Sequence, residues 1–196
     1  LNKDKLASYI KRLTKKLIPK AMPDGTGKIE FKQLSAFTTE NYMTHPISGE
    51  YSKYFIKDDL FAGGDYFLKS IAEIFINNGY DVTVSECTML HNSTFEHLIV
   101  EQLGLVFITG NFFNGLVPEN ENIINFSRFY DKEMYSNKKQ RINFDKKASL
   151  ELAKEASVCL KTALDIHDEL EKFYINAIDF ESLNHFTAEF IESLKK

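Results

Sequence analysis

The segment YFIKDDLFAGGDYFLKSIAEIFINNGYDVTV, residues 54 to 84, decides the fold class, because it reads as a strand, a glycine-containing turn, a helix and a second strand. In many proteins this succession of elements cradles a nucleotide phosphate at the helix N-terminus. Here the turn is DDLFAGGD, with acidic residues where a phosphate loop has glycine, lysine and a hydroxyl. The segment therefore indicates a fold while leaving open whether the nucleotide chemistry is present.

The helix predicted within this segment covers residues 65 to 78 and is apolar on one side. That side is formed by Leu68, Ile71, Ala72, Phe75 and Ile76. Gly79 follows at the C′ position, where helices commonly end. YDVTVSEC is the next strand, and the apolar run at residues 105 to 108 is typical of a buried parallel strand. We therefore predict an α/β fold with a parallel sheet and flanking helices.

Composition indicates an ordinary folded domain. The 196 residues are 43% hydrophobic and 27% charged, which is near the average for globular proteins. The net charge of −4 gives no basic surface for nucleic acid. No apolar run is long enough to predict a membrane partner, and Cys87 and Cys159 alone cannot form a disulfide framework. We expect a reducing, cytoplasmic location.

The C-terminal third predicts a long helix. From Leu152 the apolar positions alternate by four and three residues, which is the seam of a helix packed lengthwise on another. The seam is Leu152, Ala156, Cys159, Ala163, Ile166, Leu170, Phe173 and Ala177. Residues 182 to 194 offer a partner face through Leu183, Phe186, Phe190 and Leu194. We predict a helical hairpin beside the sheet, with Cys159 as a small core residue.

The turn keeps little of a working phosphate loop, whose pattern is G-x-x-x-x-G-K-S/T. Laid on this chain, the two glycine positions hold Asp58 and Gly63, the lysine position holds Gly64, and the hydroxyl position holds Asp65. After the buried strand, the acidic residue that would anchor magnesium is replaced by Thr109. These positions and the neighbouring Lys57 are the candidate cofactor site.

Acidic residues in this turn disfavour a polyphosphate. Asp58, Asp59 and Asp65 would bring carboxylates near it, and two like charges about 4 Å apart repel by roughly 4 kcal/mol at an effective dielectric constant near 20. Micromolar binding supplies only about 8 kcal/mol in total. We therefore expect neither ATP nor magnesium as a cofactor, unless the carboxylates point away or bind a bridging cation.

Several segments resemble a known family. They are YFIK, LKSIAEIFINNGYDVTVSEC, LIVEQLGLVFITGN, INFSRFYD and ALDIHDELEKFYINAIDF. Their order resembles an uncharacterised family of tandem-repeat P-loop ATPase-like proteins from spore-forming bacteria, in which each half carries one nucleotide-binding fold. In that family the loop reads like GxPGTGKST and the buried strand ends in Asp-Gly-Thr, whereas this chain has DDLFAGGDY and TGNFFN.

The resemblance implies a division of the chain. The amphipathic helix predicted at residues 1 to 18 shares its pattern of apolar and charged positions with SLNHFTAEFIESLKK at the C-terminus, and PKAMPDGTGK follows it as a linker. We assign residues 1–28 to the tail of a preceding repeat and residues 29–196 to a degenerate P-loop NTPase-like domain. The preceding repeat is the expected partner, and a homo-oligomer is a further one.

Three functions follow from these observations. The first is a nucleotide-hydrolase-like domain that has lost ATP binding and serves as a structural or regulatory half of a larger protein. The second is a divergent ATP-binding NTPase or kinase-like phosphotransferase that uses Lys57 with Gly63 and Gly64. The third is a protein-interaction module acting through the helical hairpin.

Two further groups of residues could hold a metal or transfer a proton. Cys87 and His91 lie close together in CTMLH, with His97 further on, but a zinc site needs three or four ligands. His167 and Glu171 share a helix face beside Asp168 and could form an acid/base pair or part of a metal site, but a solvated or interdomain helix face is the favoured interpretation. We predict no metal site.

Overall fold

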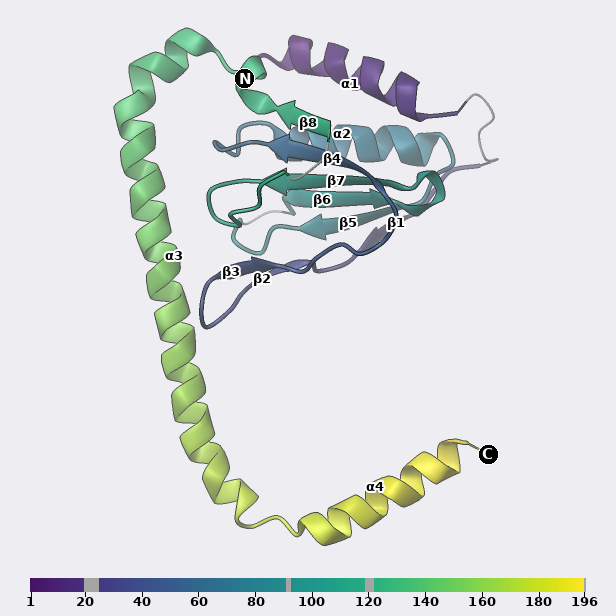
Figure 1. Cartoon of the computed structure of the whole chain (residues 1–196), viewed down its shortest axis with the longest axis vertical. Helices are drawn as coiled ribbons and strands as arrows, with labels where there is room; N and C mark the ends of the chain where they lie inside the picture. Colours follow the sequence, from purple (N-terminus) through teal and green to yellow (C-terminus); the bar gives the residue numbers. More distant parts are fainter. Residues whose placement is uncertain (20–24, 91–92, 119–121, 196) are drawn as a thin grey trace.

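The computed structural model describes residues 1–19, 25–90, 93–118 and 122–195 (Figure 1). A six-stranded sheet forms the centre, a short two-stranded hairpin lies beside it, and two helices run away from it. The elements in chain order are α1 (Lys3–Leu17), β1 (Ile29–Phe31), β2 (Ser35–Phe37), β3 (Tyr42–Thr44), β4 (Ser52–Lys57), α2 (Gly64–Asn77), β5 (Val82–Glu86), β6 (Phe95–Val100), η1 (Glu101–Leu103), β7 (Leu105–Gly110), β8 (Asn122–Asn125), η2 (Phe126–Phe129), α3 (Lys132–Ile175) and α4 (Phe180–Leu194).

The sheet is mixed, so the α/β class is confirmed and the purely parallel sheet is wrong. The strand order is β1-β5-β6-β7-β4-β8, and β6 pairs antiparallel with both β5 and β7. The pairs β1 with β5, β7 with β4 and β4 with β8 are parallel. Only residues 87–94 and 101–104 separate β6 from its neighbours, which is too short for a crossover helix. Short connections therefore force β6 to reverse direction.

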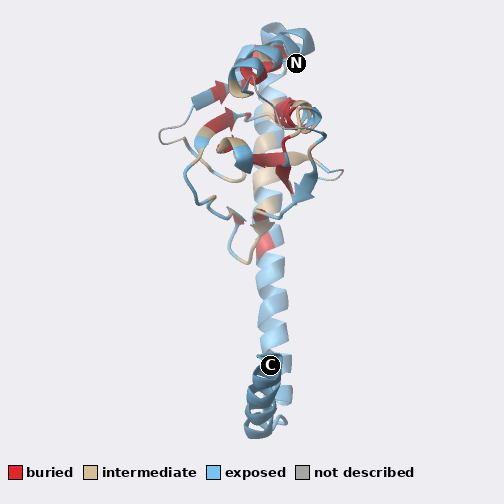
Figure 2. Cartoon of the chain, turned by 90° about the vertical axis from the view of Figure 1, so that its right-hand side faces the viewer, coloured by how far each residue is buried: buried red, intermediate tan, exposed pale blue. Residues whose placement is uncertain are grey.

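The core lies between the sheet and α2, with α1 packed over α2. Its largest members are aromatic, with Phe67 and Phe75 from α2 lying about 6 Å from the Phe107 ring of β7. Leu6 and Ile10 of α1 belong to the same buried cluster. Gly79 takes a left-handed φ of 83° at the C′ position of α2, directly after the C-cap Asn78, as the sequence predicts. Figure 2 shows the buried residues gathered in this part of the molecule.

Helix α3 passes the carboxyl ends of the parallel strands. It begins at Lys132, well before the seam noted in the sequence, because Asp131 caps it by accepting the Met134 N–H at 3.0 Å. The arrowheads of β4, β7 and β5 point toward it in Figure 1. Lys146 Nζ lies 4.7 Å from the centre of the Phe112 ring, so the helix contacts the loop after β7. The turn between β4 and α2 lies at this same edge of the sheet.

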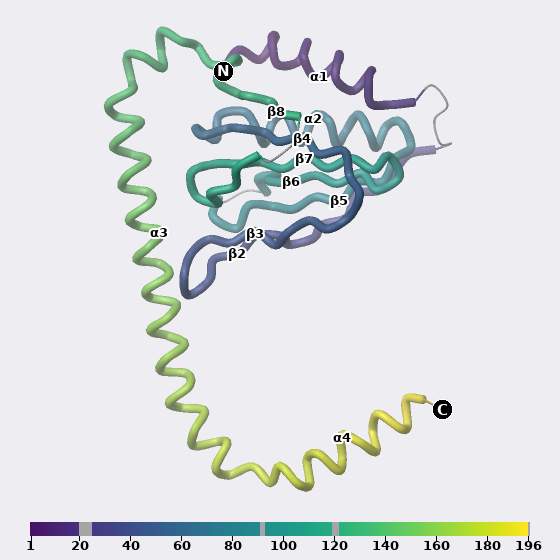
Figure 3. Tube along the Cα trace, viewed as in Figure 1, coloured from purple at the N-terminus to yellow at the C-terminus, as the bar shows by residue number. Residues whose placement is uncertain are grey.

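The packed helical hairpin expected from the sequence is not formed. Both helices exist, but α4 turns away from α3 (Figure 3), and the seam residues Leu152, Ile166, Leu170 and Phe173 are exposed. Cys159 is exposed as well, so its prediction as a core residue is wrong. Apolar periodicity shows which face of a helix favours burial, but it does not say which surface covers that face.

None of the described helices carries an apolar stretch long enough to cross a lipid bilayer. The apolar side chains of α3 and α4 are interrupted by charged ones, as in HDELEK.

Candidate functional site

The turn between β4 and α2 lies where a phosphate-binding loop would lie. Strand β4 ends at Lys57, opposite Gly110 of the parallel strand β7, and α2 begins at Gly64 with Gly63 as its N-cap. The first N–H groups of a helix have no partner within the helix, and the helix dipole favours an anion beside them. The backbone therefore forms an anion cradle at the carboxyl edge of the sheet.

Asp58 fills this cradle with its own carboxylate. One oxygen, Oδ2, accepts the N–H groups of Gly63 at 3.0 Å and Gly64 at 2.7 Å, and Oδ1 accepts the Ala62 N–H at 3.2 Å. The Tyr130 hydroxyl donates to Oδ1 at 2.6 Å. With 1% of its surface exposed, Asp58 is an internal anion bound by the N–H groups that a phosphate would use.

Tyr130 completes the enclosure of this carboxylate. Burial raises the pKa of the Tyr130 hydroxyl, and the charge and hydrogen bond of Asp58 raise it further. The phenol therefore keeps its proton and remains a donor to Asp58. Tyr130 directly precedes Asp131, the N-cap of α3, so the cradle is joined to the start of the long helix.

The space around Gly63 and Gly64 admits little else. A Cβ at Gly64 would lie 3.2 Å from Asp58 Oδ2, and one at Gly63 would lie 3.0 Å from the Phe126 ring. A phosphate loop carries lysine at the position of Gly64, and the Cβ of a lysine there would make this same close contact with Asp58 Oδ2. Gly64 is therefore fitted closely to the bound carboxylate and Gly63 to the Phe126 ring, because a Cβ at either position would lie closer than ordinary van der Waals contact.

The remaining predicted site residues line a small space. Asp65 Oδ1 accepts the Phe95 N–H at 2.8 Å, and Asp65 Oδ2 accepts from Lys69 Nζ at 3.0 Å, which ties α2 to β6. Thr109 is buried in β7, and its Oγ1 has no hydrogen-bond partner among the described residues. The cavity lined by Asp58, Asp65 and Thr109 measures about 30 Å³, room for a single water molecule and far too little for a triphosphate.

Lys57 faces away from this cavity. Successive side chains of a strand point to opposite faces, and here Asp58 is buried while Lys57 is exposed. Lys57 lines two open cavities of about 300 and 410 Å³ together with Asp59 and Asn125, and neither is lined by Gly63 or Gly64. The structure therefore brings Asp58, Gly63, Gly64, Asp65 and Thr109 together and leaves Lys57 outside.

The turn itself contains one left-handed residue. Phe61 has a φ of 51°, which is unfavourable for a bulky residue. Its ring lies 5.4 Å from that of Phe112 and 5.6 Å from that of Phe113, so aromatic packing against the loop after β7 offsets the strain. Of the aromatic groups in this region, Phe126 and Phe129 are fully buried.

A buried polar cluster beside the cradle is not predicted from the sequence. Glu96 of β6 accepts from the Tyr42 hydroxyl at 2.9 Å and from Asn114 Nδ2 at 3.2 Å. Burial raises the pKa of Tyr42, and the charge of Glu96 raises it further. The only signal was a charged residue within the apolar strand FEHLIV, which does not identify partners that are distant in the sequence.

His97 belongs to the same cluster. Its Nδ1 accepts the Thr109 N–H at 3.2 Å, and its Nε2 lies 3.4 Å from Ser35 Oγ. Burial lowers the pKa of His97, although the neighbouring Glu96 opposes that shift. Both ring nitrogens are therefore engaged by protein groups. Of the cysteine and histidine group considered above, Cys87 is buried near the Tyr42 hydroxyl, and His91 lies outside the described residues.

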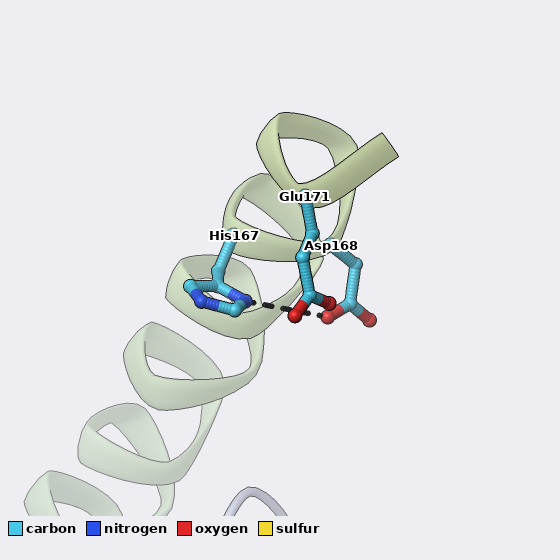
Figure 4. A group of neighbouring side chains, drawn as sticks. All are labelled: His167, Asp168 and Glu171. Atoms are coloured by element: carbon cyan, nitrogen blue, oxygen red, sulfur yellow. Dashed lines mark ion pairs between the residues drawn. The ribbon is translucent and has the colours of Figure 1, made fainter. Parts of the chain in front are cut away.

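One trio among the described residues has ligand atoms close enough for a metal ion. The ligand atoms of His167, Asp168 and Glu171 lie within 4.8 Å of one another on α3, and Figure 4 shows them side by side. His167 Nδ1 lies 3.6 Å from Asp168 Oδ1. All three side chains are exposed, so water competes for each of them. The trio is a solvated ion-pair face, which is worth little in stability or binding.

Comparisons with protein-family models, with curated proteins and with solved structures find no match. The function of this chain is therefore inferred from the geometry of the Asp58 cradle.

Proposed function

We propose that this domain is nucleotide-hydrolase-like, has lost ATP binding, and acts as a structural or regulatory half of a larger protein. The observation that carries the proposal is the Asp58 carboxylate, which accepts the N–H groups of Ala62, Gly63 and Gly64 at the start of α2. The strand, turn and helix around it have the arrangement of a phosphate-binding unit, with a side chain in place of the phosphate.

A nucleotide would have to displace this carboxylate. Hydrogen bonds to a charged group contribute about 1.5–3 kcal/mol each, and Asp58 accepts four. The displaced carboxylate would then stand beside the phosphates, where like charges repel by several kcal/mol. Because Asp58 is covalently part of the chain, a displaced carboxylate stays next to the cradle and cannot diffuse away from it. Micromolar ATP binding supplies about 8 kcal/mol, which does not exceed these costs.

The filled cradle serves instead as a structural joint. Through Tyr130, Asp58 connects the turn before α2 to the start of α3, which projects well beyond the sheet (Figure 1). A domain that fixes the direction of a 44-residue helix from its former ligand site is suited to hold other parts of a protein in place. The assignment of residues 1–28 to the tail of a preceding repeat is consistent with such a role.

Calorimetric titration with Mg-ATP tests the proposal. We expect no saturable heat with the wild-type chain up to about 1 mM ATP, a concentration that detects even weak binding. Low-micromolar binding that is abolished by changing Gly64 or Asp65 would overturn the proposal. The matched control is Asp59→Gly, which alters an exposed neighbouring carboxylate and should leave the titration silent.

The alternative function, a divergent ATP-binding NTPase, can be tested by measuring ATP hydrolysis. It requires Lys57 to reach Gly63 and Gly64, and the orientation of Lys57 toward other cavities does not favour it. ATP hydrolysis that is present in the wild type and lost in Lys57→Ala would restore it.

A further inference from the structure

Helices α1 and α4 are built to the same plan. Each has 15 residues, and with Lys3 aligned on Phe180 their caps coincide. Asn2 accepts the Lys5 N–H at 2.9 Å, and Asp179 accepts the Ser182 N–H, at the same position of its helix, at 3.1 Å. The residue before each cap is apolar, Leu1 in one case and Ile178 in the other, as in a hydrophobic staple.

The apolar positions of the two helices coincide as well. Four large side chains of α1 match four of α4 in the same order, and Thr187 stands where α1 has Ile10. The matches are Leu6 with Leu183, Tyr9 with Phe186, Leu13 with Phe190, and Leu17 with Leu194. The signs of most charges differ, because α1 is rich in lysine and α4 in glutamate: Glu181 aligns with the acidic Asp4, but Glu189 and Glu192 align with Arg12 and Lys15. What the helices share is therefore one apolar face with its N-terminal cap.

In α1 this face is seated on a defined surface, formed by α2 and η2. The Tyr9 ring lies 6.4 Å from that of Phe67 in α2 and 5.6 Å from that of Phe129 in η2. The Asn2 N–H donates to the Phe129 carbonyl at 2.7 Å, and Lys5 Nζ donates to the Arg128 carbonyl at 2.8 Å. We call this the α2–η2 seat.

In α4 the same face is open. Leu183, Phe186 and Phe190 are 47%, 65% and 53% exposed, whereas Leu6 of α1 is fully buried. Figures 1 and 3 show α4 at the far end of α3, away from the sheet. Large aromatic side chains on one exposed helix face mark an interaction surface.

We propose that α4 is a docking helix whose partner is the α2–η2 seat of a second copy of this domain, where it takes the place that α1 takes in the first. The seat fits a helix of this length, with this cap and this order of apolar side chains. Charges on the solvent side differ between the two helices, but exposed charges contribute little to such packing. Consecutive copies would then be joined through α3, with α4 inserted into the neighbour.

A graft in the full chain tests whether α4 carries the pattern that the seat requires. Residues 3–17 are replaced by the sequence of residues 180–194, and a second graft keeps isoleucine at the Ile10 position. A control graft has serine at the positions of Leu183, Phe186 and Phe190. We expect at least one of the two grafts to unfold cooperatively within about 5 °C of the wild type, and the control to melt more than about 10 °C lower. Both grafts melting as low as the control would overturn the proposal.

Docking between molecules needs a separate measurement. A fluorescent peptide of residues 178–195 is added to the full chain carrying Leu6→Ser and Leu13→Ser, which weaken the hold of α1 while leaving the seat intact. We expect saturable anisotropy and a rise in the melting temperature of this chain. A peptide with Phe186→Ser and Phe190→Ser should do neither, and equal behaviour of the two peptides would overturn the docking.

This inference rests on the proposed function only in requiring a second copy of the domain. Neither measurement involves a nucleotide. Binding of Mg-ATP would therefore refute the proposed function without changing the graft result, and a failed graft would leave the filled cradle as it stands.

Discussion

Removing the Asp58 carboxylate should expose an unoccupied anion cradle and destabilise the domain. In Asp58→Ala, the N–H groups of Ala62, Gly63 and Gly64 and the Tyr130 hydroxyl all lose their acceptor. Four hydrogen bonds to a charged group sum to roughly 6–12 kcal/mol before water replaces some of them. Breaking one partner of a buried charged contact costs about 3–5 kcal/mol in practice. We take that range as the expected loss in the free energy of unfolding.

The melting temperature reports this loss directly. For a chain of 150–250 residues, 1 kcal/mol shifts the melting temperature by about 2–4 °C, so Asp58→Ala should melt about 6–20 °C below the wild type. Circular dichroism at 222 nm follows the transition. Asp59→Ala is the matched control, because Asp59 carries the same charge one position later and is exposed. We expect this control to change the melting temperature by no more than about 2 °C.

Inorganic phosphate should then recognise the emptied cradle. A free helix N-terminus binds anions, and a ligand that binds only the folded chain raises its melting temperature. Phosphate at constant ionic strength should stabilise Asp58→Ala and leave the wild type unchanged. If Asp58→Ala melts within about 2 °C of the wild type, or if phosphate stabilises both chains equally, the carboxylate does not fill an anion site.

Three further changes examine the same region. Tyr130→Phe removes one donor to Asp58 and should cost about 2 kcal/mol, seen as a fall of about 4–8 °C in the melting temperature, and no fall would mean that the hydroxyl is dispensable. Gly64→Ala brings a Cβ to 3.2 Å from Asp58 Oδ2 and should destabilise the wild type by about 1–2 kcal/mol in urea unfolding, but not the Asp58→Ala chain; equal costs in both would contradict the close fit. His97 is buried with a lowered pKa, so below about pH 6.5 the unfolded chain binds more protons than the folded chain, and the free energy of unfolding should fall by up to about 1.4 kcal/mol per pH unit. Urea unfolding of His97→Gln at about pH 7.5 and about pH 5.5 should show a smaller fall than the wild type. An equal fall in both chains would mean that a group other than His97 causes the pH dependence.

Local patterns in the sequence determine the central elements. Apolar spacing predicts α2 with Leu68, Ile71 and Phe75 on its buried side, and Gly79 after its end. The strands β4, β5 and β7 lie where short β-prone runs predict them. These features depend on neighbours a few residues apart, so the sequence contains the physical cause of each. The sequence also shows which residues of a phosphate loop are replaced, at Asp58, Gly64 and Asp65.

Contacts between distant residues were decided only by the tertiary structure. The sequence places Asp58 at the rim of a cradle and predicts repulsion, whereas the structure turns its carboxylate inward, to be met by Tyr130 from 72 positions later. The reversal of β6 and the buried Glu96 contacts with Tyr42 and Asn114 depend on such pairings as well. Three of the donors to Asp58 lie within six residues of it in the same turn. The fourth donor, Tyr130, and the partners of Glu96 come within about 3 Å only because the fold brings distant segments together.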